Sequence, residues 1–241
     1  MQIVISAVFS IPFFIFALFT ALSFAGPAQQ ETAASKPTEP LFDNLGTWHH
    51  AITTGKPLAQ QYFDQGLRLV YAFNHEEAVR SFEEAARIDP GAAMAYWGIA
   101  YALGPNINAP MDREQERRAY EAIQKARTHA EKVTPRERAY IDALTVRYSI
   151  APDADRKSLD AAYADAMRNL HRQEPGDTDA GTMFAEALMN LRPWDYWTLD
   201  GQPQPGTTEL VAVLEDVLKR NSDHIGACHY YIHAAEAWKP E

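Results

Sequence analysis

The segment HYYIHAAE near the end of the chain carries the clearest chemical signal in the sequence. It places His229 and His233 four residues apart and Glu236 three residues further on. Because residues three and four apart share one face of an α-helix, a helix here would present two imidazoles and a carboxylate together. Such a set can bind Zn, Cu or Fe and leave one coordination position open. The alternative is a hydrogen-bonded polar surface without a metal.

Other catalytic chemistry finds little support in the sequence. The histidine motif lacks the glutamate that follows the first histidine in zinc proteases, and Glu186 is our first candidate for a further ligand. We find no Gly-rich phosphate loop, no Gly-x-Ser-x-Gly motif and no Cys-x-x-Cys pair. A metal-dependent enzyme, for example an oxidoreductase, is therefore the alternative hypothesis, and a protein without catalytic activity is the favoured one.

The elements that position these residues begin with the stretch AQQYFDQGLRLVYAFNHEEAVRSFEEAARIDP, residues 59–90. It carries the spaced small, bulky and terminating residues of a 34-residue helix–turn–helix unit. These residues are Tyr62, Gly66, Ala78, Phe82, Ala85 and Pro90. The stretch resembles the tetratricopeptide repeat (TPR) family. The resemblance implies an all-α fold, a right-handed TPR-like α-solenoid of about four and a half helix pairs, which binds a protein or peptide and assembles complexes rather than catalysing a reaction.

The apolar pattern predicts where later helices of the solenoid lie. Residues 134–137, Thr-Pro-Arg-Glu, form a capping box that should start a helix. Other helices are expected over residues 93–103, 157–172, 178–191, 207–220 and 225–237. The last of these lacks a partner helix. The chain is therefore either truncated at its C-terminus or self-associates through that helix.

Two sets of residues are candidates for partner binding. In a solenoid of this kind the first helix of each pair lines the concave groove. The groove-binding candidates are Tyr71, Trp97, Tyr101, Thr182, Glu186, Met189 and Asn190. Insertions between paired helices project from one edge, and the edge-loop candidates are Asn106, Asn108, Trp194, Tyr196 and Trp197. The alternatives are that the groove aromatics fill space between repeats and that the loops vary without function.

The remaining histidines receive weaker predictions. We expect His75 to be a packing residue, because four repeats would separate it from His233 by about 30–40 Å unless the superhelix closes on itself. His49 and His50 precede the first repeat and could fold back over the groove, although the sequence does not place them. His129, His171 and His224 are expected at the surface.

The N-terminal sequence predicts the localisation of the protein, and its net charge argues against one class of partner. Residues 3–25 are apolar and uncharged and end in Ser-Phe-Ala, so residues 1–25 are expected to be a signal peptide or an uncleaved membrane anchor. Residues 26–40 should form a disordered linker before a repeat domain over residues 41–241. The protein is then exported, to the periplasm or the extracellular space, and its one cysteine, Cys228, forms no internal disulfide. A net charge of -10 argues against nucleic acid.

Overall fold

The computed structural model describes residues 37–238, and within them the chain is all-helical. The predicted leader and most of the predicted linker lie outside the described residues. Two isolated β-bridges occur in loops, and no strand forms between residues 37 and 238. The helices are α1 (Pro57–Tyr71), α2 (His75–Ile88), α3 (Ala93–Leu103), α4 (Arg113–His129), η1 (Ala130–Lys132), α5 (Pro135–Thr145), α6 (Arg156–Gln173), α7 (Thr178–Leu191), α8 (Thr207–Arg220) and α9 (Ile225–Ala235).

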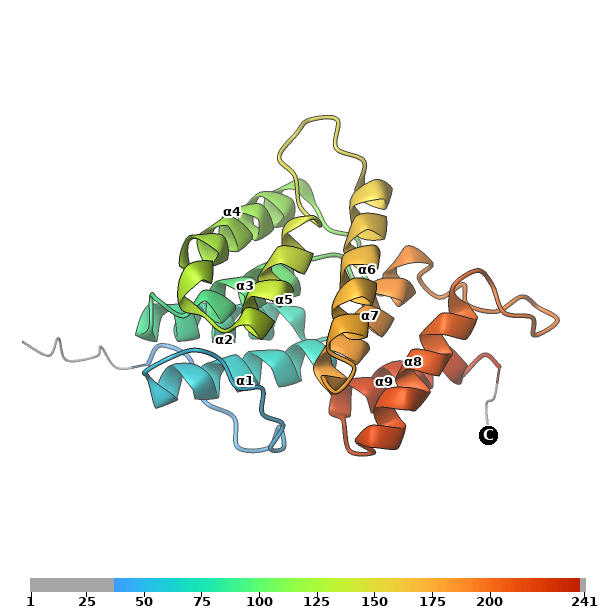
Figure 1. Cartoon of the computed structure of the whole chain (residues 1–241), viewed down its shortest axis with the longest axis horizontal. Coiled ribbons are helices and arrows are strands. Elements are labelled where there is room, and N and C mark those ends of the chain that lie inside the picture. Colours follow the sequence, from blue (N-terminus) through green and yellow to red (C-terminus); the bar gives the residue numbers. More distant parts are fainter. Residues whose placement is uncertain (1–36, 239–241) are drawn as a thin grey trace, which may run out of the picture. The chain divides into compact units, whose positions relative to one another are not determined.

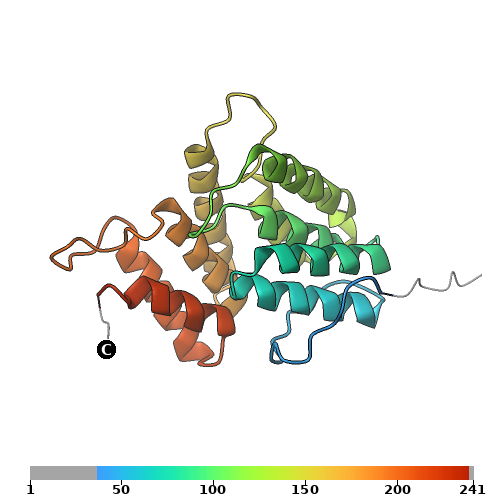
Figure 2. The same cartoon turned by 180° about the vertical axis from the view of Figure 1, so that it is seen from behind.

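Helices that follow one another in the sequence pack against one another. Figures 1 and 2 show α1, α2, α3 and α4 lying one over another, seen from opposite sides. Alternate helices also contact each other: α1 contacts α3, α3 contacts α5, and α7 contacts α9. In addition α9 contacts α1, which brings the last described helix back to the first.

Two glycines let the first three helices approach closely around one phenylalanine. Phe82 of α2 is fully buried, and a Cβ atom on Gly66 of α1 would lie 2.7 Å from its ring. A Cβ atom on Gly98 of α3 would lie 2.4 Å from the same ring. Because real Cβ contacts are longer than this, both positions require glycine unless Phe82 moves. Gly66, one of the spaced small residues of the 59–90 stretch, is thus a point of close helix approach.

Side chains at the helix N-termini fix where several helices begin. Thr134 and Glu137 form the predicted capping box at the start of α5, which confirms that prediction. Asp112 and Gln115 form a second capping box at the start of α4. Each capping side chain accepts a hydrogen bond from a backbone N–H that has no partner inside the helix. The boundaries therefore follow from local sequence.

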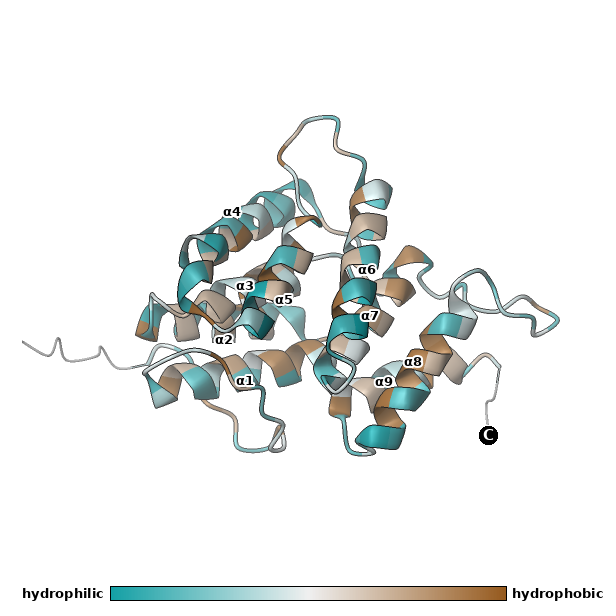
Figure 3. Cartoon of the chain, viewed as in Figure 1, coloured by the Kyte–Doolittle hydropathy of each residue, from teal (hydrophilic) through white to brown (hydrophobic). Residues whose placement is uncertain are grey.

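The helices turn their polar sides outward. Figure 3 shows hydrophilic residues along much of the visible side of α4, whereas its buried residues, such as Ala119 and Ile123, pack into the core. None of the helices between residues 37 and 238 combines the length and the apolar character needed to cross a membrane.

Candidate functional site

Residues 48–54, which we call the strap, form an extended segment that precedes α1 in the sequence and packs against α1 and α5. Six of its main-chain groups are hydrogen-bonded to side chains of α1 and α5. The side chains involved are Gln60, Asp64 and Arg68 of α1 and Arg136 and Glu137 of α5. The inner face, as we use the term, consists of these five residues and Asp179 of α7. These six residues all hydrogen-bond the strap.

Gln60 pairs with the strap as a neighbouring strand would. Its Nε2 donates to the carbonyl oxygen of His50 at 2.9 Å, and its Oε1 accepts from the backbone N–H of Ile52 at 3.0 Å. In a parallel β-ladder, the N–H and C=O of one residue make the same two bonds to residues two apart on the adjacent strand. The side-chain amide of Gln60 therefore recognises main-chain groups of the strap and makes these two bonds whatever the strap side chains are.

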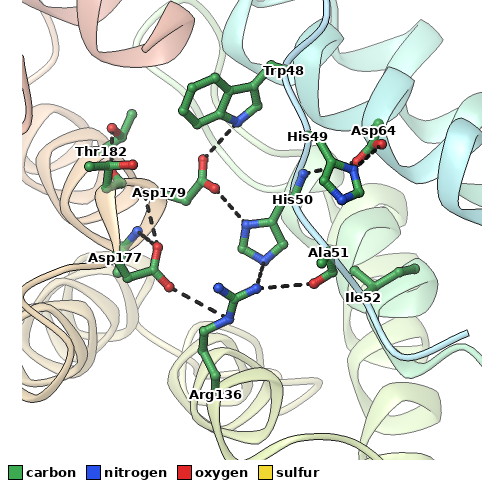
Figure 4. Close-up of polar contacts among 12 residues, drawn as sticks. Trp48, His49, His50, Ala51, Ile52, Asp64, Arg136, Asp177, Asp179 and Thr182 are labelled. Atoms are coloured by element: carbon green, nitrogen blue, oxygen red, sulfur yellow. Dashed lines mark hydrogen bonds and ion pairs between the residues drawn. The ribbon is translucent and has the colours of Figure 1, made fainter. Parts of the chain in front are cut away.

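The carboxylate of Asp179 anchors the first half of the strap from the opposite side (Figure 4). Its Oδ2 accepts from His50 Nδ1 at 2.6 Å, and its Oδ1 accepts from Trp48 Nε1 at 3.2 Å. The hydroxyl of Tyr71 also donates to Oδ1, at 2.5 Å, and His224 Nε2 lies 3.3 Å from the same atom. Asp179 thus joins the strap to α1, α7 and the start of α9.

Asp179 stays ionised in spite of its burial. Burial acts to raise the pKa of this carboxyl group, because a charge loses solvation in the interior. The hydrogen bonds from His224 and His50 outweigh that effect and hold the pKa well below its ordinary value. The strap is consequently held by charge-assisted hydrogen bonds, which are stronger than neutral ones.

Arg136 and Glu137, adjacent residues of α5, hold the second half of the strap. The Nη2 atom of Arg136 donates to the carbonyl oxygen of Ala51 at 3.1 Å and lies 3.4 Å from His50 Nε2, as Figure 4 shows. Glu137 accepts from the backbone N–H of Thr53 at 2.6 Å and from its hydroxyl at 2.5 Å. Glu137 is also the third residue of α5 and closes the capping box with the N-cap Thr134. One buried carboxylate therefore both helps to start that helix and binds the strap.

The rings of the strap differ in burial: Trp48 is half-buried, His50 is buried and His49 is exposed. The Trp48 ring lies against the His224 ring, with 4.2 Å between the ring centroids. His50 is 4 % exposed and meets Tyr140 edge-on at 5.6 Å. By contrast the side chain of His49 is 56 % exposed, although its Nδ1 reaches Asp64 at 2.7 Å. Trp48 and His50 therefore both contact Asp179, whereas His49 contacts Asp64 from a largely exposed position.

The predicted groove residues lie mostly in the core. Six of the seven are 0–5 % exposed: Tyr71, Trp97, Tyr101, Thr182, Glu186 and Met189. The seventh, Asn190, is half-buried and donates to Glu186 and to the carbonyl oxygen of Pro105. These side chains pack in the core between neighbouring helices and do not line an open groove. Tyr71 alone of the seven hydrogen-bonds Asp179 of the inner face.

The predicted edge-loop residues are not gathered on one open surface. Asn106 accepts backbone hydrogen bonds from its own turn, and Asn108 is exposed. Tyr196 is buried, and burial raises its pKa. Trp197 donates to the carbonyl oxygen of Ala234 at 2.7 Å, so it fixes the loop to α9, whereas Trp194 is 51 % exposed.

The three predicted metal ligands are brought together only in part. The Nε2 atoms of His229 and His233 lie 3.0 Å apart. Glu236 does not face the same point, because its Oε1 contacts Nδ1 of His233 at 3.0 Å, on the other side of the ring. Across residues 37–238, no three His, Cys, Asp or Glu side chains are placed to share a metal ion. Glu186 therefore does not complete a set with this pair.

Two predictions about other histidines require correction. His224 is fully buried as the N-cap of α9, where its Nδ1 accepts from the backbone N–H of Ala227, so it is not a surface residue. His75 lies near His233, because both rings pack around Phe73. The centroid of the Phe73 ring is 6.0 Å from that of His75 and 5.7 Å from that of His233. The cause is the contact between α1 and α9, which returns the last helix to the first.

Sequence reasoning missed most of the inner face. Asp179 stands at the start of α7, where an acidic residue is ordinary for a helix N-terminus. Gln60 and Asp64 are four apart, so their shared helix face was visible in the sequence, but nothing there indicated the strap. The Trp-His-His run was the one available signal.

No protein-family model and no curated protein matches this chain.

Proposed function

We propose that this protein is a TPR-like binding module whose inner face holds an extended polypeptide segment. The contacts of α1 with α3, of α3 with α5 and of α7 with α9 support a stack of helix pairs. Together with the repeat-like spacing of residues 59–90, they support the right-handed solenoid of about four and a half units. Such stacks present one continuous face to a partner.

The single observation that carries the proposal is the pairing of Gln60 with His50 and Ile52 of the strap. An inner face that reads main-chain N–H and C=O groups accepts any extended segment, as strand-addition sites do. Selectivity then comes from the two side chains that point inward, Trp48 and His50, which both donate to Asp179. The preferred partner is an extended segment with tryptophan, one further residue and then histidine.

The strap occupies this face, so a partner segment must compete with it. The strap is connected directly to α1 and has a high effective concentration at its own site. A partner therefore binds when it matches the strap contacts and the strap is released. Edge-loop residues such as Trp194, which is 51 % exposed, remain available for further contacts with the partner.

We place this activity outside the cytoplasm. The uncharged apolar run over residues 3–25 supports export, either with cleavage near residue 26 or with retention as an anchor. Mass spectrometry of the mature N-terminus distinguishes the two.

A peptide-binding experiment on the full chain tests the proposal. A fluorescent peptide with the sequence of residues 45–55, LGTWHHAITTG, is titrated with wild-type protein and with a variant that carries Trp48→Ala and His50→Ala. The variant keeps Gln60, Asp64 and Asp179 but holds its own strap weakly. We expect saturable binding to the variant and at least tenfold weaker binding to the wild type, measured by fluorescence anisotropy.

Two controls decide what a result means. A peptide in which both Trp and His are replaced by Ala should not bind the variant. Adding Gln60→Ala to the variant should weaken binding of the original peptide, because two main-chain hydrogen bonds are lost. If the variant retains its helical circular dichroism and does not bind the peptide, the inner face is a structural seat for the strap alone and the proposed function is wrong.

A further inference from the structure

His229 and His233, which we call the histidine pair, lie on the side of α9 that faces the end of α1. The residues are one helical turn apart, and their Nε2 atoms are 3.0 Å from each other. His229 is half-buried, and the side chain of His233 is 20 % exposed. The pair is therefore reachable from solvent and yet held in a defined geometry.

The partners of the other ring nitrogens fix where the protons are. His229 Nδ1 lies 2.6 Å from the carbonyl oxygen of Tyr71, and His233 Nδ1 lies 3.0 Å from Oε1 of Glu236. A carbonyl and a carboxylate only accept hydrogen bonds, so both Nδ1 atoms carry hydrogen. In the neutral rings both Nε2 atoms then bear lone pairs, although the two atoms lie only 3.0 Å apart. Such an arrangement needs a cation between the two atoms.

The separation suits two ligands of one metal ion. With a metal–nitrogen distance of about 2.05 Å, two nitrogens 3.0 Å apart subtend an angle of about 94° at the metal. This angle is compatible with neighbouring positions of a square-planar or distorted tetrahedral site. A histidine that binds metal through one nitrogen commonly donates its other N–H to a carbonyl or a carboxylate. Both histidines of the pair do so.

Two strained aromatic residues enclose the pair. Phe73 lies 4.6 Å from the His229 ring, and Trp194 meets the His233 ring edge-on at 5.1 Å. Within residues 37–238, Phe73 (φ 58°) and Trp194 (φ 60°) are the two residues other than glycine with positive φ. Left-handed backbone is unfavourable for such side chains, and strain of this kind concentrates at functional sites.

The turn that carries Phe73 shows what the strain achieves. The backbone N–H of Phe73 donates to the carbonyl oxygen of Val70, and that of Asn74 donates to the carbonyl oxygen of Leu69. These two bonds form a helix C-terminal motif in which glycine usually occupies the left-handed position. With phenylalanine at that position, the ring is carried over the histidine pair. The strained turn therefore shapes the surroundings of the pair.

The electrostatic setting also favours a cation at the pair. His233 lies in the last turn of α9, where the carbonyl ends of the helix attract positive charge. Glu236 adds a carboxylate behind the His233 ring. Both effects stabilise a cation that sits on Nε2 of His233.

We propose that His229 and His233 bind one divalent transition-metal ion, Zn²⁺ or Cu²⁺, through their Nε2 atoms. The remaining coordination positions belong to water or to an incoming ligand, because the described chain offers no third His, Cys, Asp or Glu side chain to the same point. Glu236 acts as a positioning residue that orients the His233 ring. This site is separate from the inner face, and Tyr71 contacts both: its hydroxyl donates to Asp179, and its carbonyl oxygen accepts from His229.

Metal titration of the full chain tests this proposal. Purified protein is titrated with Zn²⁺ in competition with a chromogenic chelator, and Cu²⁺ is added in a parallel sample for electron paramagnetic resonance. We expect one Zn²⁺ per chain and a Cu²⁺ spectrum with splitting from two imidazole nitrogens. His229→Ala and His233→Ala should each weaken Zn²⁺ binding at least tenfold, whereas the control His129→Ala should not change it.

A further variant separates a metal site from a structural role of the pair. Glu236→Gln keeps the shape of the side chain but weakens its acceptor, so Zn²⁺ affinity should fall by about 10–100-fold while the chain stays folded. If the alanine variants unfold, His229→Gln and His233→Gln replace them. Equal Zn²⁺ binding by the wild type and by both single histidine variants, or no binding by the wild type, overturns the proposal. A proton held between the two rings then accounts for their short separation.

Discussion

Asp179 and Glu137 are buried carboxylates, and each accepts hydrogen bonds both from the strap and from a group outside it. Asp179 accepts from Trp48 and His50, and Glu137 accepts from Thr53 while it caps α5. A buried carboxylate is costly unless several donors surround it. The same donors then hold the strap in one register. At the scale of single residues, these two side chains link the sequence before α1 to helices far along the chain.

His75 should make the protein less stable in mild acid. Burial lowers the pKa of its imidazole from 6.5 to about 4. Between these values the unfolded chain binds a proton that the folded chain does not, so the free energy of unfolding falls as pH falls from 6.5 towards 4. The full difference amounts to about 3 kcal/mol, at 1.36 kcal/mol per pKa unit.

Urea unfolding at pH 7.5 and at pH 4.5 measures this effect. The wild type should lose more stability between the two conditions than His75→Phe, which keeps a ring stacked on Phe73 but carries no proton. Equal losses in the two proteins would show that another group is responsible for the acid sensitivity.

The helices themselves were largely predictable from sequence, because their signals are local. The predicted helix over residues 93–103 matches α3 (Ala93–Leu103), and that over residues 178–191 matches α7 (Thr178–Leu191). Capping residues and apolar spacing act within a few positions of one another. At the scale of elements, the sequence thus contains what is needed to start, end and orient each helix.

Gly98 should be the position in the helices that is least tolerant of a methyl group. An alanine Cβ atom at this position would lie 2.4 Å from the Phe82 ring, which is fully buried and cannot move freely. Gly98→Ala should therefore lower the free energy of unfolding by about 1–3 kcal/mol through overpacking.

Gly176→Ala is the matched control for this substitution. Nothing lies within 4 Å of a Cβ atom built there, so its effect should stay within about 0.5 kcal/mol. Both values come from chemical denaturation followed by circular dichroism. Similar stability of the two variants would contradict the close packing of α3 against Phe82.

The inner face could not be predicted from sequence in the same way, because it depends on contacts between distant residues. Asp179 and His50 are separated by 129 positions, and the contact of α1 with α9 joins the two ends of the described helices. No local pattern encodes either one. The expectation of an open groove consequently placed Trp97 and Tyr101 at a surface, whereas both lie in the core. The histidine pair was identifiable because its two members share one helix.

At the scale of the whole molecule, the strap covers the inner face and so determines whether its side chains are accessible. It contacts α1, α5 and α7 and the first residue before α9, so it ties together helices from both halves of the described chain. Release of the strap would expose Asp179 and Gln60 together. On the proposed function, a partner segment could therefore bind only where the strap has left the inner face.

Amide hydrogen exchange of the strap tests the central claim most directly. The backbone N–H groups of His50, Ile52 and Thr53 donate to Asp64, Gln60 and Glu137, so we predict slow exchange at all three in the wild type. Gln60→Ala should accelerate exchange at Ile52 and leave Thr53 protected. Exchange at all three positions as fast as in an unstructured peptide would contradict the account, because the inner face would then not hold the segment.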